Sequence, residues 1–119
     1  MKEQFVLIFR RGEKPLSNAE QQARASEVRN WALSRLQEDP TFEPRVLGDD
    51  SYHLPNIGGT LDDNQSVIAL NFLEATDLRE AIAIARTHPG LNYGTMIEVR
   101  PWKDPRNAAA PGTNIDSRA

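Results

Sequence analysis

Apolar runs and amphipathic stretches alternate along the first hundred residues of the chain. Residues 5–9, with Arg10 at their end, are continuously apolar and rich in aromatic and β-branched side chains, and residues 67–73 are apolar except for Asn71. Such runs are typical of strands that are buried on both faces. Residues 44–48 form a weaker strand candidate, and residues 94–102 alternate apolar and polar positions. The pattern therefore predicts four strands, separated by two segments with helical periodicity.

Both helical segments have recognisable starts. Ser17 is followed three residues later by Glu20, and Asp77 is followed by Glu80, which is the spacing of a capping box. We expect the first helix to end near Asp39, because a proline follows it. A His-Pro-Gly sequence at 88–90 should end the second helix. The apolar stripes expected to face the sheet are Ala25, Val28, Ala32 and Leu36 on the first helix, and Leu78, Ala81, Ile82 and Ala85 on the second.

The resulting order β-α-β-β-α-β predicts an α+β, ferredoxin-like fold. It has a four-stranded antiparallel sheet with two helices on one face. The chain has 119 residues, which is the length of one domain. We assign this domain to residues 1–102. Residues 49–65 form a long loop, and residues 103–119 read as a tail without a core of its own.

The second face of the sheet needs a cover. Two helices cover one face only, yet the strands at 5–9 and 67–73 are apolar on both sides. A symmetric partner is the economical solution, so we expect a homodimer. In the last strand, Ile97 and Val99 share one face, while Glu98 and Arg100 point to the other.

Composition excludes several classes of function. The net charge of -3 at pH 7 argues against non-specific electrostatic binding to nucleic acid or to an anionic membrane. The absence of cysteine excludes disulfides, thiolate metal sites and a cysteine nucleophile. No apolar run approaches the length of a membrane helix, and no signal-peptide core follows the N-terminus. We therefore expect a cytoplasmic protein.

The two histidines are the first candidates for chemistry. His88, at the end of the second helix, could act as a general acid or base at the mouth of a cleft. Its alternative role is to cap the helix terminus. His53 lies in the long loop beside aspartates that could orient a ligand-binding imidazole. The histidines and aspartates lack the spacing of a metal site, so we expect no metal.

Charged side chains on the last strand form the second group of candidates. Arg100, together with Arg10 on the neighbouring strand, could anchor a carboxylate or phenolate, with Glu98 as proton acceptor. The alternative is a ladder of ion pairs across the strands or across a dimer. Asn71, inside an apolar strand, is either a polar contact in a cleft or a satisfied core amide. Tyr93 could line an aromatic pocket or fill an interface.

Motifs for nucleotide or covalent chemistry are absent. The chain has no Gly-x-Ser-x-Gly elbow, no phosphate-binding Gly-x-x-x-x-Gly-Lys loop, and no Gly-x-Gly-x-x-Gly after a strand. We expect no cofactor. The sequence by itself leaves open whether the protein is an enzyme.

The stretch 72–102 resembles the C-terminal half of the YCII-related proteins. The matching pieces are Glu-Ala-Thr-Asp-Leu-Arg-Glu-Ala at 74–81, the helix-ending Pro89, and Gly-Thr-Met-Ile-Glu-Val-Arg-Pro at 94–101. The resemblance implies a dimeric α/β barrel, in which two ferredoxin-like subunits stack their sheets. It further implies a protein of unassigned activity that binds or converts a small anionic or aromatic compound in the barrel cleft. The alternative is a non-catalytic structural or interaction dimer.

Overall fold

The chain folds in the order that the sequence pattern predicts. The computed structural model describes residues 2–12, 15–52, 54 and 66–108. Its strands and helices, in chain order, are β1 (Glu3–Arg10), α1 (Asn18–Glu38), β2 (Glu43–Val46), β3 (Val67–Ala75), α2 (Leu78–Arg86) and β4 (Met96–Pro101). Two further short elements are the 3₁₀ helix η2 (Pro89–Tyr93) and the helix α3 (Pro105–Ala108). The helix α3 lies in the segment that the sequence suggested was only a tail.

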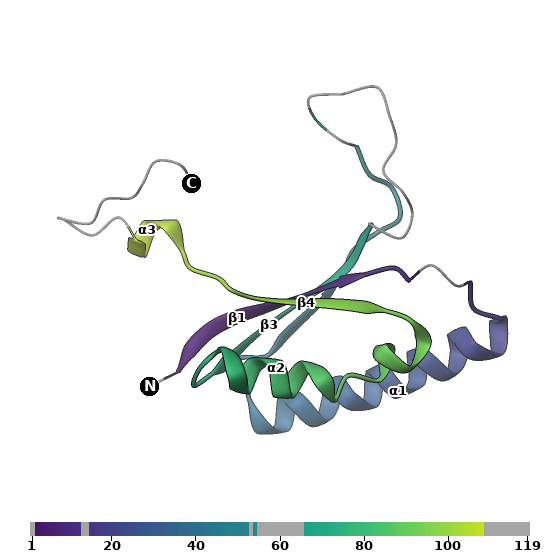
Figure 1. The fold of residues 1–119 in the computed structure, drawn as a ribbon, viewed down its shortest axis with the longest axis horizontal. Coiled ribbons are helices and arrows are strands. Elements are labelled where there is room, and N and C mark those ends of the chain that lie inside the picture. The colour runs from purple at the N-terminus through teal and green to yellow at the C-terminus, as the bar shows by residue number, and fades with distance from the viewer. Residues whose placement is uncertain (1, 13–14, 53, 55–65, 109–119) are drawn as a thin grey trace.

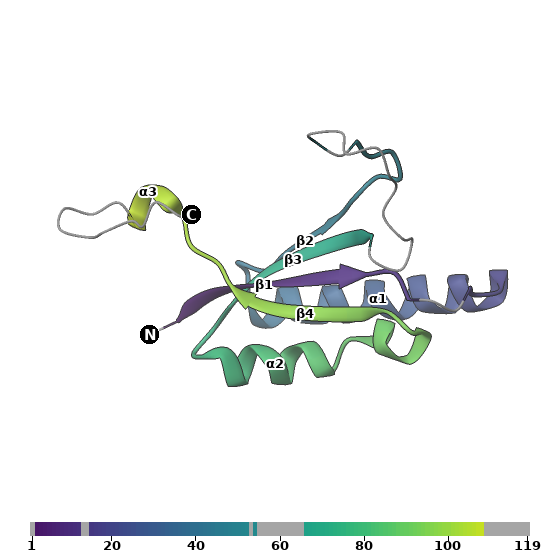
Figure 2. The same ribbon diagram turned by 45° about the horizontal axis from the view of Figure 1, so that its top comes forward.

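The four strands form one sheet in the order β2-β3-β1-β4, and all neighbouring strands are antiparallel. Helices α1 and α2 lie side by side under one face of this sheet, and the described residues place no helix over its other face (Figure 1, Figure 2). The predicted α+β fold, with two helices against a four-stranded antiparallel sheet, is therefore confirmed.

Both predicted helix starts are present. The Ser17 hydroxyl accepts a hydrogen bond from the Glu20 amide at 3.1 Å, and the Glu20 carboxylate accepts one from the Ser17 amide at 2.9 Å. This reciprocal pair is a complete capping box. At α2, Asp77 caps the Glu80 amide, but the Glu80 carboxylate reaches one residue further back and accepts from the Thr76 amide.

The end of α1 is fixed to the sheet by Asp39. Its carboxylate accepts hydrogen bonds from the Thr41 amide at 2.9 Å and from the Glu74 amide of β3 at 3.3 Å. Burial pushes the pKa of Asp39 up, but hydrogen bonds from the Thr41 hydroxyl and from the Glu74 and Thr41 amides outweigh burial and hold the pKa below its usual value. The carboxylate therefore fixes the turn after α1 and joins it to β3, while the Asp39 amide closes the helix by donating to the Arg35 carbonyl at 2.8 Å.

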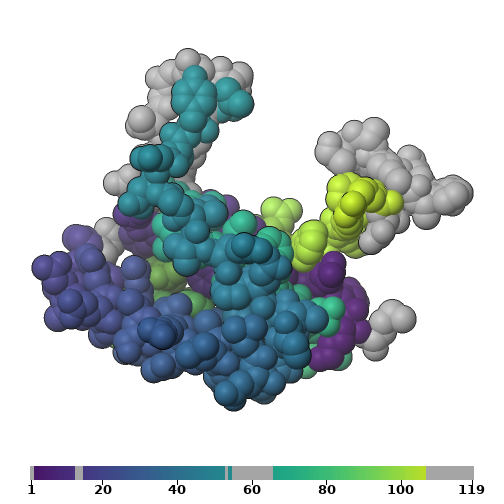
Figure 3. All heavy atoms as spheres, turned by 180° about the vertical axis from the view of Figure 1, so that it is seen from behind, coloured from purple at the N-terminus to yellow at the C-terminus, as the bar shows by residue number. Residues whose placement is uncertain are grey.

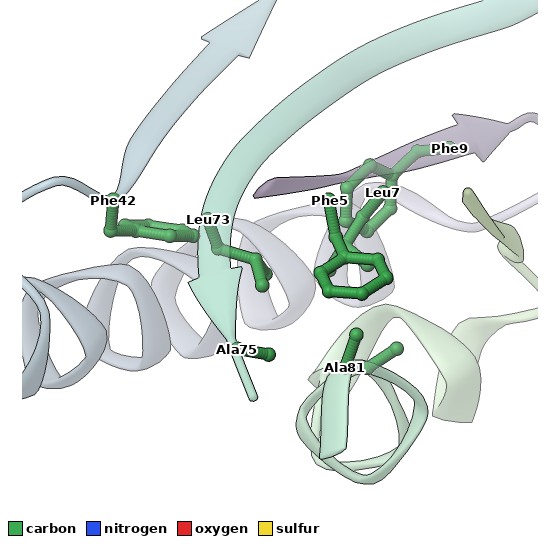
Figure 4. Packing of buried hydrophobic residues seen from close by; sticks show 8 residues of the cluster. Phe5, Leu7, Phe9, Phe42, Leu73, Ala75 and Ala81 are labelled. Carbon is green, nitrogen blue, oxygen red and sulfur yellow. The ribbon is translucent and has the colours of Figure 1, made fainter. Parts of the chain in front are cut away.

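The core lies between the sheet and the helices. Phe5, Leu7 and Phe9 of β1 point down into it from the central strand, and Leu7 has no exposed surface. Figure 4 shows these three side chains beside Leu73 and above Ala81 of α2. The complete buried cluster is Phe5, Leu7, Phe9, Phe42, Leu73, Ala75, Ala81 and Ala85. Packing of this layer provides the main hydrophobic stabilisation of the chain.

The predicted inner stripe of α1 is partly wrong. Ala25 and Leu36 are exposed, and no residue of α1 is fully buried. Ala32 of the predicted stripe does pack against the core, together with Trp31, which was not part of that stripe. The indole of Trp31 is long enough to reach Phe42, with 5.6 Å between ring centroids, so α1 can contact the core without lying deep in it.

Candidate functional site

The sheet face opposite the helices gathers the charged residues of the predicted site. Strand alternation and register place Val6 and Ile8 of β1 on this face, paired with Phe72 and Leu70 of β3. We call the surface around these four residues the open face. On the β4 side, Val6 lies level with Arg100, and Ile8 lies level with Glu98. The open face is thus aliphatic and aromatic in its centre and charged towards its β4 edge.

Three charged side chains form a row on the open face. The Arg10 guanidinium lies 3.3 Å from one Glu98 oxygen, and the Arg100 guanidinium lies 3.6 Å from the other. Arg10 is the most covered of the three, with 35% of its side chain exposed, compared with 64% for Arg100. Two cations thus share one carboxylate. This row matches the predicted ion-pair ladder across strands, and its two guanidinium groups are also the groups that the predicted anion contact requires.

A second charged pair occupies the opposite edge of the open face. Glu43 and Arg45 of β2 are level with Phe72 and Leu70, and their side chains form an ion pair. The Arg45 Nε donates to Glu43 at 2.7 Å. These two residues were not among the sequence candidates. The sequence could have identified them, because residues 43–45 and residues 98–100 share the spacing Glu-x-Arg on the two edge strands.

A shallow hollow lies at one end of the open face. It has a volume of about 260 Å³, and its walls include Gln4, Phe72, Glu74 and Trp102. The rings of Phe72 and Trp102 meet edge to face, with 5.3 Å between their centroids. The hollow therefore offers an apolar aromatic wall next to a carboxylate.

His88 lies on the helix side of the sheet, away from Glu98. Its ring packs between Phe9 and Trp31, with centroid distances of 4.6 Å to each. The Nδ1 atom accepts a hydrogen bond from the Gly90 amide at 2.9 Å, so the imidazole caps η2. Burial, helped by the positive charge of Arg24, lowers the pKa of His88 to about 4. The environment keeps His88 neutral, and the residue fits a capping role better than acid–base chemistry. The predicted cap was at the end of α2, whereas the imidazole caps the start of η2.

Asn71 and Tyr93 also lie outside the charged row. Asn71 is 6% exposed and pairs with Leu7, which places its amide on the helix side of the sheet. The Tyr93 hydroxyl donates to Glu27 of α1 at 2.7 Å. This hydrogen bond and the charge of Glu27 raise the pKa of Tyr93. Both residues therefore contact the helix layer, and His53 lies outside the described residues.

Of the sequence-predicted residues, the structure brings together Arg10, Glu98 and Arg100. Among the described residues, no group of three or more histidines, aspartates or glutamates is arranged to hold a metal ion. Within the same residues, no helix combines the length and the apolar character needed to cross a membrane. Comparison with protein-family models and with curated proteins finds no match to this chain.

Proposed function

We propose that the chain forms a homodimer through its open face and binds a small anionic compound there, as its resemblance to the YCII-related proteins implies. The observation that carries this proposal is the row of Arg10, Glu98 and Arg100 beside an aliphatic sheet centre. Val6 is buried in the single chain, but Ile8, Leu70 and Phe72 are only partly buried. A partner over the open face would remove these three side chains from water, which favours association.

The ligand contact is assigned to Arg10. A guanidinium carries five N–H donors in a planar fork, a geometry that matches the two oxygens of a carboxylate. Arg10 is better covered than Arg100, so water screens its contact with an anion less. Ile8 lies level with Glu98 and offers an apolar surface for the body of the ligand. In a conversion reaction, Glu98 is the nearest group for accepting a proton.

Sedimentation equilibrium over a wide protein concentration range tests the dimer. Isothermal titration calorimetry with sodium benzoate, a small aromatic carboxylate, tests the anion site. Arg10→Met should weaken benzoate binding at least about tenfold, because the charge-assisted hydrogen bonds are lost. Arg11→Met, which removes an exposed neighbouring arginine, is the matched control and should leave binding unchanged. Equal affinities for the two variants would refute the assignment to Arg10.

A second candidate function is a non-catalytic interaction module whose dimer surface is its main feature. The positions of the predicted site residues favour this second function. His88, Asn71 and Tyr93 lie on the helix side of the sheet and not beside the charged row. A tight dimer that binds neither benzoate nor other small anions would support this function over the first.

A further inference from the structure

The hollow at one end of the open face lies where β1 and β3 meet the chain that follows β4. Gln4 of β1 is level with Glu74 of β3, and the Trp102 amide donates to the Gln4 carbonyl at 3.1 Å. Phe72 lies two residues before Glu74, so both side chains point to the same face of the sheet. Figure 3 shows, from behind, the chain after β4 leaving the sheet beside the start of β1. Two aromatic rings and a carboxylate therefore line one short stretch of sheet.

Glu74 carries the unbalanced charge of this hollow. Among the described residues, its carboxylate forms no ion pair and no hydrogen bond. The other acid in the wall, Glu43, is paired with Arg45. Arg100 of β4 is held by Glu98, which lies further from the hollow along the strand. The hollow thus contains a negative charge that no ion pair within the described part of the chain balances.

The ring of Trp102 is within reach of a ligand. Its side chain belongs to a residue that is 37% exposed, and it meets Phe72 edge to face, with an angle of 68° between the ring planes. In this arrangement, the ring that presents its edge keeps both of its faces free of the other ring. The face of an aromatic ring attracts a cation, and an indole does so most strongly. The rings and the Glu74 carboxylate therefore favour the same class of ligand, an organic cation.

The size and the position of the hollow narrow this class. Its volume of about 260 Å³ suits a single small group. A hard metal ion needs several oxygen ligands, and the described residues contain no group of three acids or histidines arranged for one. Gln4 precedes Arg10 by six residues on β1, which separates the hollow from the charged row by about 20 Å along the strand. The hollow is thus a different site from the anion contact at Arg10.

We propose that this hollow binds a methylated ammonium group, such as the head of a quaternary amine. The methyl groups pack against Trp102 and Phe72, and the Glu74 carboxylate balances the positive charge. Every side chain of the site comes from one chain, so binding does not require the homodimer of the proposed function. The inference adds a second ligand of opposite charge to the anion proposed for Arg10.

Nuclear magnetic resonance of the full isotope-labelled chain tests the site with choline chloride as the probe. The chain has two tryptophans, so it gives two indole N–H signals, which the variant Trp102→Phe assigns. The Trp31 indole donates to Thr87 at 2.7 Å on the helix side and serves as an internal reference. Dimethylbutanol, in which an uncharged tert-butyl group replaces the trimethylammonium group, is the control ligand. Sodium chloride keeps the ionic strength constant.

Choline should shift the Trp102 signal to saturation and leave the Trp31 signal in place, and dimethylbutanol should bind at least about fivefold more weakly. Glu74→Gln should weaken choline binding at least about fivefold, because the carboxylate charge is lost. Glu3→Gln is the matched variant, since it removes the same charge from an exposed position on the opposite face of the sheet and should leave binding unchanged. The backbone amide spectrum verifies that each variant folds.

Three results would overturn the proposal. Equal binding of choline and dimethylbutanol would show that the hollow does not recognise charge, and this comparison uses the wild-type chain alone. Equal affinities of the Glu74→Gln and Glu3→Gln variants would remove the carboxylate from the site. Parallel shifts of both indole signals would show a non-specific effect. Neither benzoate binding nor dimerisation enters these readouts, so the hollow and the proposed function can fail independently.

Discussion

Lowering the pH from 7.5 to 5 is expected to destabilise the chain through His88. The imidazole is 6% exposed, lies against Phe9 and Trp31, and accepts a hydrogen bond from the Gly90 amide. Protonation would bury a charge in this packed layer. It would also turn Nδ1 into a donor, so the bond to Gly90 would be lost. Both effects oppose protonation of the folded chain.

The size of the effect follows from the two pKa values. The pKa of His88 is about 4 in the folded chain, compared with 6.5 for an ordinary histidine. Between these values the unfolded chain binds a proton and the folded chain does not, so unfolding takes up a proton. The free energy of unfolding therefore falls with falling pH, by roughly 1.4 kcal/mol per unit within this window. From pH 7.5 to pH 5 the expected loss is about 2 kcal/mol.

Urea unfolding at a fixed protein concentration, followed by circular dichroism, measures this loss. His88→Gln keeps an acceptor but cannot titrate, so its stability should lose most of the pH dependence above pH 5. His53→Gln replaces the other histidine of the chain and should retain the wild-type dependence. Stopping at pH 5 limits the contribution of carboxylates, whose ordinary pKa values are near 4. A wild-type stability that is flat across this range, or a His88→Gln variant that still loses about 2 kcal/mol, would refute the reasoning.

Two further predictions concern packing and capping. Leu7→Ala should lower the free energy of unfolding by about 2–5 kcal/mol, because Leu7 is fully buried, whereas Leu33→Ala, at a side chain 52% exposed, should cost less than about 1 kcal/mol. Urea titration of the two variants compares them, and equal losses would contradict the assigned core. Ser17→Ala should cost about 1 kcal/mol by removing the capping box of α1, while Ser26→Ala, exposed within the same helix, should stay within about 0.5 kcal/mol. Thermal unfolding distinguishes these two, and a loss at Ser26 as large as that at Ser17 would argue against the cap.

Features set by neighbours in the sequence were predicted well. The caps at Ser17 and Asp77 depend on groups three residues away, so the sequence spacing contained the whole interaction. The faces of β4 followed from simple alternation, and Glu98 and Arg100 lie together as expected. Local hydrogen bonding and strand geometry were sufficient for these features.

Features that depend on tertiary contacts were predicted poorly. The inner side of α1 carries Arg24 and Arg35, which are partly buried, where the apolar spacing pointed to Ala25 and Leu36. Long arginine stems can cover apolar surface while their charged ends stay near water, so hydropathy alone misplaces this face. His88 gained its surroundings from β1 and α1, which are distant in the sequence. Spacing along the chain carried no information about that pocket.

The dimer and the anion site of the proposed function share the open face, where Arg10 lies 3.3 Å from Glu98. A partner over this face would remove water from the contact between Arg10 and an anion, which would strengthen that contact. Binding that depends on the partner in this way must be reciprocal, because the coupling free energy is shared by both equilibria. Benzoate should therefore tighten the dimer by the same factor by which dimerisation raises the affinity for benzoate, and Arg10→Met should abolish that tightening.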